Sequence, residues 1–332
     1  MAKQEMSISK LAASIPTEAD AYLKLEELRW DGHPICPHCG VKDQAWYIRP
    51  LNGTSRKTRT GSMSQRRVWK CGACRKQFSV LTGTIFQGSK IPVRTWLLVV
   101  FEMCASKNGV SAREIERKYE LTAKTAWFML HRIREAMRRE PLAGLLRGTV
   151  MSDESWIGGT PANRHRSDPR EKVRQPGTTD KTPVLSLIHH ETREVRSRVI
   201  PTVDGETLAD AIAEQVDGSR TELWTDSSKP YITVAKDMRG HQSVDHAAGQ
   251  YVKRVNGGRM TTNAVEGFFS QLKRSIDGTH HHVSKTHLSR YLDQFDFMYS
   301  LCKQTDSARM HALISRAAGR RLSYKPLTGG NA

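Results

Sequence analysis

Three acidic residues in the second half of the sequence have the positions expected of a metal-binding set. Asp153 and Asp226 each end a strand-like stretch, and Glu266 lies near the start of a predicted helix. Carboxylates at the ends of neighbouring strands can converge on one site, and Mg²⁺ prefers oxygen ligands of this kind. Phosphodiester transfer uses two hard cations about 4 Å apart. We therefore predict that the three acids hold a pair of Mg²⁺ or Mn²⁺ ions for such chemistry.

Two further polar residues share a face of the helix that carries Glu266. Lys273 follows Glu266 by seven residues, almost two helical turns, and Asn263 precedes it by three. Asn263 is therefore an alternative third ligand. We favour Glu266, because a charged carboxylate binds Mg²⁺ better than an amide does. Lys273 is predicted to hold a phosphate oxygen or to orient DNA, and not to bind the metal.

The elements around these residues predict a mixed α/β domain. An aspartate after a strand is more often a loop residue or a helix cap than a metal ligand, so the order of elements carries the argument. Strand-like stretches lie at 149–152, 184–189, 194–200 and 221–225, with a helix at 206–216. The polar, basic stretch 160–183 is predicted to be an insertion in this domain, which reaches residue 302.

Four of the six cysteines form two Cys-x-x-Cys pairs, Cys36 with Cys39 and Cys71 with Cys74. Each turn of this kind aims two thiolates at one point, so two turns supply four ligands for a closed tetrahedral zinc site. The pattern predicts one structural Zn²⁺ rather than a redox site. His38 lies inside the first turn and is expected to be a bystander, because four thiolates already complete the coordination.

Two segments carry residues suited to DNA contact. The stretch between the cysteine pairs is rich in cations, which fits either a phosphate-binding ribbon or a solvated loop. Residues 90–142 contain three predicted helices, the second capped by Ser111, and resemble a helix-turn-helix; a plain helical linker is the alternative. In the third helix, His131 and Arg132 are expected on the exposed side. The predicted DNA-binding residues are Arg56, Lys57, Arg59, Arg66, Arg67, Lys124 and Arg132.

The composition favours a nucleic-acid partner. The 332 residues include 52 Lys and Arg against 34 Asp and Glu, a net charge of +18. A polyanion offsets such an excess directly, although a generic basic surface is the alternative. The sequence has no run of about 18 apolar residues, and its start lacks the apolar core of a signal peptide. We expect no membrane association and a cytoplasmic location, on the nucleoid when bound to DNA.

Four stretches of the sequence resemble one known family. The family is the bacterial insertion-sequence transposases with an N-terminal zinc ribbon and a ribonuclease-H-like catalytic domain. Its catalytic set is two aspartates, then Glu, Asn or His, then Lys, which by motif falls on Asp153, Asp226, Glu266 and Lys273. The resemblance implies strand cleavage at element ends and 3′-OH transfer into target DNA, by a dimer or larger assembly on double-stranded DNA. The stretches are Ser152–Gly159, Thr225–Tyr231, Thr262–Arg274 and Gly278–Ser284.

The expected fold is multidomain, with both α+β and α/β parts. It comprises an N-terminal helix (1–32), a zinc ribbon (33–88), a helix-turn-helix-like segment (90–142), a ribonuclease-H-like mixed-sheet domain (147–302) and a basic, weakly helical C-terminal tail (303–332). Two alternatives to a strand-transferring enzyme stay open. One is a DNA-binding regulator whose α/β domain is inactive, and the other is a plain metal-dependent nuclease that cleaves without joining.

Overall fold

The computed structural model describes residues 6–49, 66–139, 144–158, 181–245, 248–250, 252–255 and 258–328. The chain forms two compact units. The N-terminal unit comprises Met1–Arg138 and Lys303–Ala332, and the sheet unit comprises Arg139–Cys302. The chain therefore leaves the N-terminal unit once and returns to it for its last segment.

The N-terminal unit is mostly helical. A three-stranded antiparallel sheet of order β1-β2-β3 forms its ribbon, from β1 (Ala45–Tyr47), β2 (Trp69–Cys71) and β3 (Gln77–Phe78). The helices are α1 (Ile8–Ser14), α2 (Glu18–Trp30), α3 (Val93–Ala105), α4 (Ala112–Tyr119), α5 (Ala123–Met137), α10 (Asp306–Arg316) and α11 (Tyr324–Leu327).

Short polar side chains fix where these helices begin. Thr17 and Asp20 form a reciprocal capping box at the start of α2. The Ser111 hydroxyl accepts a hydrogen bond from the backbone N–H of Glu114 (3.1 Å), and Thr122 caps α5 in the same way. Because such caps satisfy N–H groups that have no partner inside the helix, they separate α4 from α5. The predicted cap at Ser111 is confirmed.

The C-terminal segment is part of the core of the N-terminal unit and is not a free tail. Helix α10 packs against α2, α3 and α5. Arg309 donates a hydrogen bond to the backbone carbonyl of Cys104 (2.7 Å) and pairs with Asp306, which anchors α10 to the end of α3. The expectation of a weakly helical tail was wrong. It was based on the many charged residues of the segment and overlooked the helical spacing of its apolar residues. That i, i+3, i+4 spacing belongs to the buried residues Met310, Leu313 and Ile314.

The sheet unit contains one mixed five-stranded sheet of order β6-β5-β4-β7-β8. The β4–β5 and β5–β6 pairs are antiparallel, whereas β4–β7 and β7–β8 are parallel. This order confirms the predicted ribonuclease-H-like class. The strands are β4 (Leu146–Ile157), β5 (Thr182–His189), β6 (Val195–Val199), β7 (Val216–Asp226) and β8 (Gly240–Val244), and a separate hairpin joins β9 (Lys253–Val255) to β10 (Gly258–Met260).

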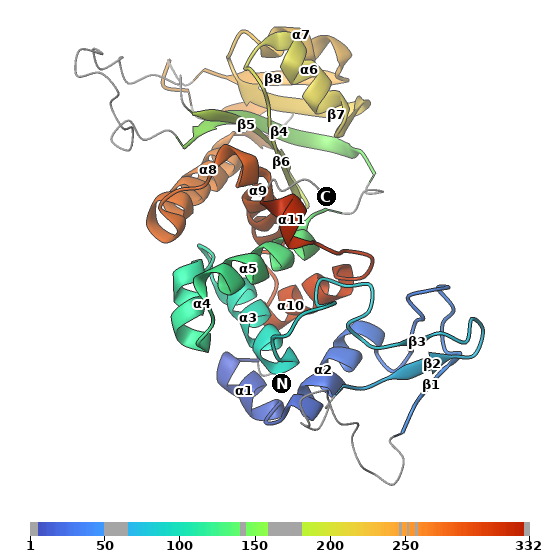
Figure 1. The fold of residues 1–332 in the computed structure, drawn as a ribbon. Coiled ribbons are helices and arrows are strands. Elements are labelled where there is room, and N and C mark those ends of the chain that lie inside the picture. Colours follow the sequence, from blue (N-terminus) through green and yellow to red (C-terminus); the bar gives the residue numbers. More distant parts are fainter. Residues whose placement is uncertain are drawn as a thin grey trace, which may run out of the picture. The chain divides into compact units, whose positions relative to one another are not determined.

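Helices cover both faces of this sheet (Figure 1). Helices α8 (Asn263–Ser275) and α9 (Lys285–Ser300) cover one face, with a π-helical turn at Ile276–His280 between them. Their apolar residues share a core with Met151 of β4 and Trp224 of β7. Helix α6 (Gly205–Ala213) and the short α7 (Tyr231–Val234) cover the other face, where Val150 and Leu223 are buried.

The largest differences from the predicted strand limits are in β4 and β7. Strand β4 continues to Ile157, so Asp153 lies within the strand and does not end it. The prediction stopped early because the polar residues from Ser152 to Ser155 interrupt the apolar pattern, although every one of them is paired with β5. Val216 begins β7 rather than ending a helix.

Among the described residues, no helix is long and apolar enough to cross a membrane.

Candidate functional site

The four predicted zinc ligands come together in the ribbon. The ligand atoms of Cys36, Cys39, Cys71 and Cys74 all lie within 4.8 Å of one another. The backbone N–H of Cys74 lowers the pKa of the Cys71 thiol, whereas desolvation and the neighbouring thiols raise the pKa of Cys39, because the four sulfurs lie close enough to share protons. The cluster confirms a site for structural zinc. His38 is outside it and lies 3.3 Å from the Gln77 carbonyl oxygen instead.

The arginines that lead into β2 make contacts within the protein. Arg67 forms an ion pair with Glu26 of α2 at 2.8 Å, and its guanidinium lies 4.2 Å from the centre of the Tyr47 ring. Glu26 also accepts a hydrogen bond from the Trp69 indole N–H (2.8 Å). Arg66 donates to the Ser79 hydroxyl. These contacts attach the ribbon to α2, so Arg67 is held by Glu26 in this structure. Arg56, Lys57, Arg59 and most of the predicted insertion 160–183 lie outside the described residues.

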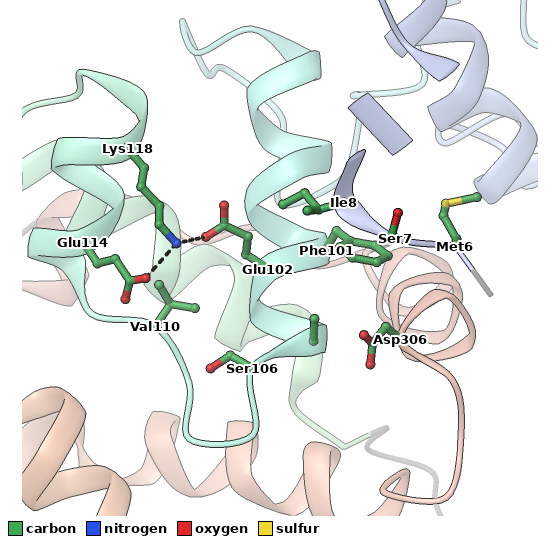
Figure 2. Close-up of a pocket in the computed structure, with 11 residues that line it drawn as sticks. Met6, Ser7, Ile8, Phe101, Glu102, Ser106, Val110, Glu114, Lys118 and Asp306 are labelled. Atoms are coloured by element: carbon green, nitrogen blue, oxygen red, sulfur yellow. Dashed lines mark hydrogen bonds and ion pairs between the residues drawn. The ribbon is translucent and has the colours of Figure 1, made fainter. Parts of the chain in front are cut away.

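The helix-turn-helix-like segment consists of α3, α4 and α5. Lys118 of α4 bridges Glu102 of α3 and Glu114 of α4, at 2.9 and 2.7 Å (Figure 2). The Tyr119 hydroxyl also donates to Glu102 (2.7 Å). The bridge lies on the wall of a cavity of about 610 Å³ that is lined by three acids, the third being Asp306. This polar network fixes α4 against α3, and the acids make the cavity unsuited to anions.

Helix α5 presents only its first turns to solvent. Lys124 is exposed, as a DNA-contacting residue near the start of the helix requires. His131 and Arg132 are buried, with exposed fractions of 0 and 5%. The expectation that these two lie on the exposed side was wrong, because α10 packs against α5 and because Gln87 and Trp96 contact Arg132. Arg132 lines a cavity instead, and its Nη2 donates to the Gln87 carbonyl (2.7 Å).

In the sheet unit, the two predicted aspartates lie on neighbouring parallel strands. Met151 of β4 is the direct partner of Trp224 of β7. Asp153 and Asp226 each follow these partners by two residues, and side chains two residues apart in a strand point to the same face. Met151 and Trp224 belong to the core under α8, so the two aspartates lie on the face that α8 covers. Asp226 is the last residue of β7, as predicted.

Helix α8 carries the other predicted members. Val265 and Phe268 are buried against the sheet, which leaves Asn263 and Lys273 exposed and Glu266 half-buried in the first turn. The Glu266 carboxylate accepts a hydrogen bond from the Thr262 hydroxyl at 2.8 Å. Glu266 is therefore held at the N-terminal end of the helix, close to its buried side, whereas Asn263 faces solvent.

The structure orients the three carboxylates without clustering them. Among the described residues, the four cysteines are the group of three or more such side chains whose ligand atoms lie close enough together to hold one metal ion. Asp153, Asp226 and Glu266 do not form a group of this kind in the structure. Their donor atoms still suit Mg²⁺, since all three are carboxylates that share one face of the sheet unit.

A fourth acid, Glu154, was missed by the sequence analysis. It lies on the opposite face of β4, where Tyr231 hydrogen bonds to it and one carboxyl oxygen is buried without a partner among the described residues. Burial raises the pKa of Glu154 to about 7, and the charges of Asp153 and Asp226 add to the increase. The adjacent acids in the Asp-Glu pair were the available signal. Tyr231 could not have been paired with them without the fold.

Comparison with known protein families identifies the class of protein to which the chain belongs. Residues 145–300 match the model of the ISXO2-like transposase domain, and residues 16–77 match the transposase zinc-ribbon domain. The sheet unit and the ribbon are thus the two modules of a transposase, and together the two models cover about two thirds of the chain. The chain is also 24% identical over 302 residues to a protein of the transposable element ISH50 from Halobacterium salinarum, covering 88% of this chain and 94% of the relative. The chain belongs to the insertion-sequence transposases with an N-terminal zinc ribbon.

Proposed function

We propose that this transposase cleaves DNA strands at the ends of its element and transfers the resulting 3′-OH ends into target DNA. The observation that carries the proposal is the register of β4 and β7, which brings Asp153 and Asp226 to one level on the face covered by α8. Glu266 stands in the first turn of that helix. Mg²⁺ or Mn²⁺ ions held by these carboxylates would stabilise charge on the attacking and leaving oxygens.

The remaining residues position the substrate. Lys273, exposed on α8, would bind a non-bridging phosphate oxygen. Lys124 at the start of α5 would contact DNA, and the net charge of +18 would draw the duplex to the protein. Because two element ends must react in one event, the active form would be a dimer or a larger assembly on DNA.

The test is an assay on a plasmid that carries the DNA flanking the gene on both sides. Protein is added with Mg²⁺ or Mn²⁺, and cleaved and joined products are scored separately. Asp153→Asn and Asp226→Asn should abolish both products while DNA binding, measured by gel shift, is retained. Asp237→Asn, an exposed aspartate of the same unit, is the matched control and should stay active.

The outcomes separate the three functions. Cleaved and joined products from the parent protein support the proposal. Cleavage without joining would identify a plain nuclease, and sequence-specific binding without any cleavage would identify a regulator. Retained cleavage in Asp153→Asn would reject the assignment of the catalytic set.

A further inference from the structure

A second cavity of the N-terminal unit differs from the acidic one in its charge. It measures about 610 Å³ and lies beside the first turns of α5. We call it the α5 pocket and define it by its cationic and aromatic lining, Lys90, Lys124, Arg132, Trp96, Phe128 and Tyr324. No acid is among the described residues that line it. The volume lies in the range of roughly 300–1,000 Å³ found for small-ligand sites.

The guanidinium of Arg132 is the most unusual group in this pocket. The side chain is 5% exposed, and its Nε is buried without a hydrogen-bond partner among the described residues. Its Nη2 donates a hydrogen bond to the Gln87 carbonyl. Burial lowers the pKa of Arg132 to about 10, and the charge of Arg321 lowers it further. A buried cation without a carboxylate partner is costly, and a bound anion would offset that cost.

Aromatic rings form the other part of the lining. The Arg132 guanidinium lies 5.2 Å from the centre of the Trp96 ring and 5.5 Å from that of Phe128. Tyr324 of α11 packs edge-on against Phe128, with ring centres 5.4 Å apart, and the Lys124 ammonium lies 4.4 Å from the Tyr324 ring centre. Half-buried Phe128 and Tyr324 therefore offer aromatic surface next to three cations.

Cations combined with aromatic rings match one ligand class. A nucleotide has a phosphate for the cations and a planar base for the rings, which is how proteins bind unpaired nucleic acid. An inorganic anion would use the cations alone. The position of the pocket beside Lys124 and Thr125, at the start of α5, favours a DNA strand as the source of the nucleotide.

We propose that the α5 pocket binds one unpaired nucleotide of the DNA, with its phosphate at Lys124 and Arg132 and its base against Phe128 and Tyr324. This inference rests on the proposed function only for the source of the nucleotide. It assigns to α11 a role in ligand binding, because Tyr324 supplies one wall of the pocket.

The test uses the full-length protein without added Mg²⁺, so that it does not depend on the catalytic carboxylates. Calorimetry measures binding of dAMP and of inorganic phosphate, and fluorescence anisotropy measures binding of a labelled single strand of about twelve nucleotides. We expect saturable dAMP binding, weaker phosphate binding, and competition between dAMP and the single strand. A duplex of the same sequence should compete less well.

Substitutions then locate the site. Tyr324→Ala and Lys124→Gln should each weaken dAMP and single-strand binding about tenfold, whereas Tyr324→Phe keeps the ring and should bind as the parent does. Lys325→Gln removes the same charge from the neighbouring exposed residue, which does not line the pocket, and should have little effect.

Several outcomes would overturn the inference. They are phosphate binding as tight as dAMP binding, no saturable binding of either, or equal effects of Lys124→Gln and Lys325→Gln. Binding of dAMP without competition by the strand would reject DNA as the source. Loss of strand transfer with intact nucleotide binding would instead reject the proposed function alone.

Discussion

The hydroxyl groups of Ser152 and Tyr231 lie 2.8 Å apart, on the face of the sheet opposite to Asp153. Tyr231 also hydrogen bonds to Glu154, so the residues on both sides of Asp153 in β4 are attached to α7. The contacts of Tyr231 with Ser152 and Glu154 fix the backbone of β4 on both sides of Asp153. Because side chains alternate along a strand, the network supports the aspartate without touching it.

Tyr231→Phe should therefore affect both stability and cleavage. Loss of a buried hydrogen bond costs about 1–3 kcal/mol, which chemical denaturation of the sheet unit would measure. Strand cleavage should fall about tenfold or more, because a small shift of the strand that carries Asp153 misplaces its carboxylate, while DNA affinity stays the same. Unchanged cleavage in a destabilised variant would show that the network serves the fold alone.

Glu266 and Asn263 can be separated by substitution. Glu266→Gln keeps the shape of the side chain and the contact with Thr262 but removes the charge. Mg²⁺-dependent cleavage should therefore fall by more than the roughly 10–100-fold that removing a hydrogen-bond partner of a ligand costs. Asn263 is exposed, so Asn263→Ala should cleave within a few fold of the parent rate. The comparison is made with plasmid cleavage over a range of Mn²⁺ concentrations. The reverse ranking would assign the third position to Asn263.

The zinc centre should stabilise the fold and take no part in catalysis. In zinc-finger peptides a structural zinc contributes on the order of 10 kcal/mol of folding free energy, so Cys71→Ser should release zinc and unfold the ribbon. Zinc content by atomic absorption, and melting followed by tryptophan fluorescence, would show both effects, because Trp69 lies in β2. Cys302→Ser, at an exposed cysteine outside the cluster, is the control. Full zinc retention in Cys71→Ser would contradict the four-thiolate site.

Asp296 of α9 should give the sheet unit a pH-dependent stability. Its carboxylate accepts hydrogen bonds from the backbone N–H and the hydroxyl of Ser197, both at 2.6 Å. Burial raises the pKa of Asp296 to about 7, above its ordinary value of 3.8. Between these two values the unfolded chain releases a proton that the folded protein retains. Stability is therefore full below about pH 4, declines as the pH rises to 7, and is constant above that.

The size of this effect can be measured by substitution. Asp296→Asn should remove the decline in stability with pH and should be more stable than the parent at pH 8. We expect a difference of about 1–2 kcal/mol, because solvent reaches the half-buried side chain and reduces the effect. Urea unfolding at pH 5, 6.5 and 8 would check it, with Asp210→Asn on the exposed side of α6 as the control. A variant whose stability follows the parent's pH profile would rule out Asp296 as the responsible group.

The sequence predicts best what local chemistry determines. The cysteine cluster follows from two short turns, and Asp226 and Glu266 occupy the predicted strand end and helix start. What the sequence misses depends on distant partners. Arg132 has the appearance of a surface cation in the helical pattern of α5, yet it is buried because Gln87 and Trp96 surround it. The polar part of β4 is a strand because β5 pairs with it.

The return of the chain to the N-terminal unit has a consequence for synthesis. A ribosome completes Met1–Arg138 long before it makes Lys303–Ala332, so the apolar groove that α10 fills stays open while the whole sheet unit is translated. A truncated product would lack Met310 and Leu313 and would expose their contacts in the N-terminal unit. Prematurely ended copies should therefore aggregate or be degraded, and would not persist as fragments that compete with the intact protein.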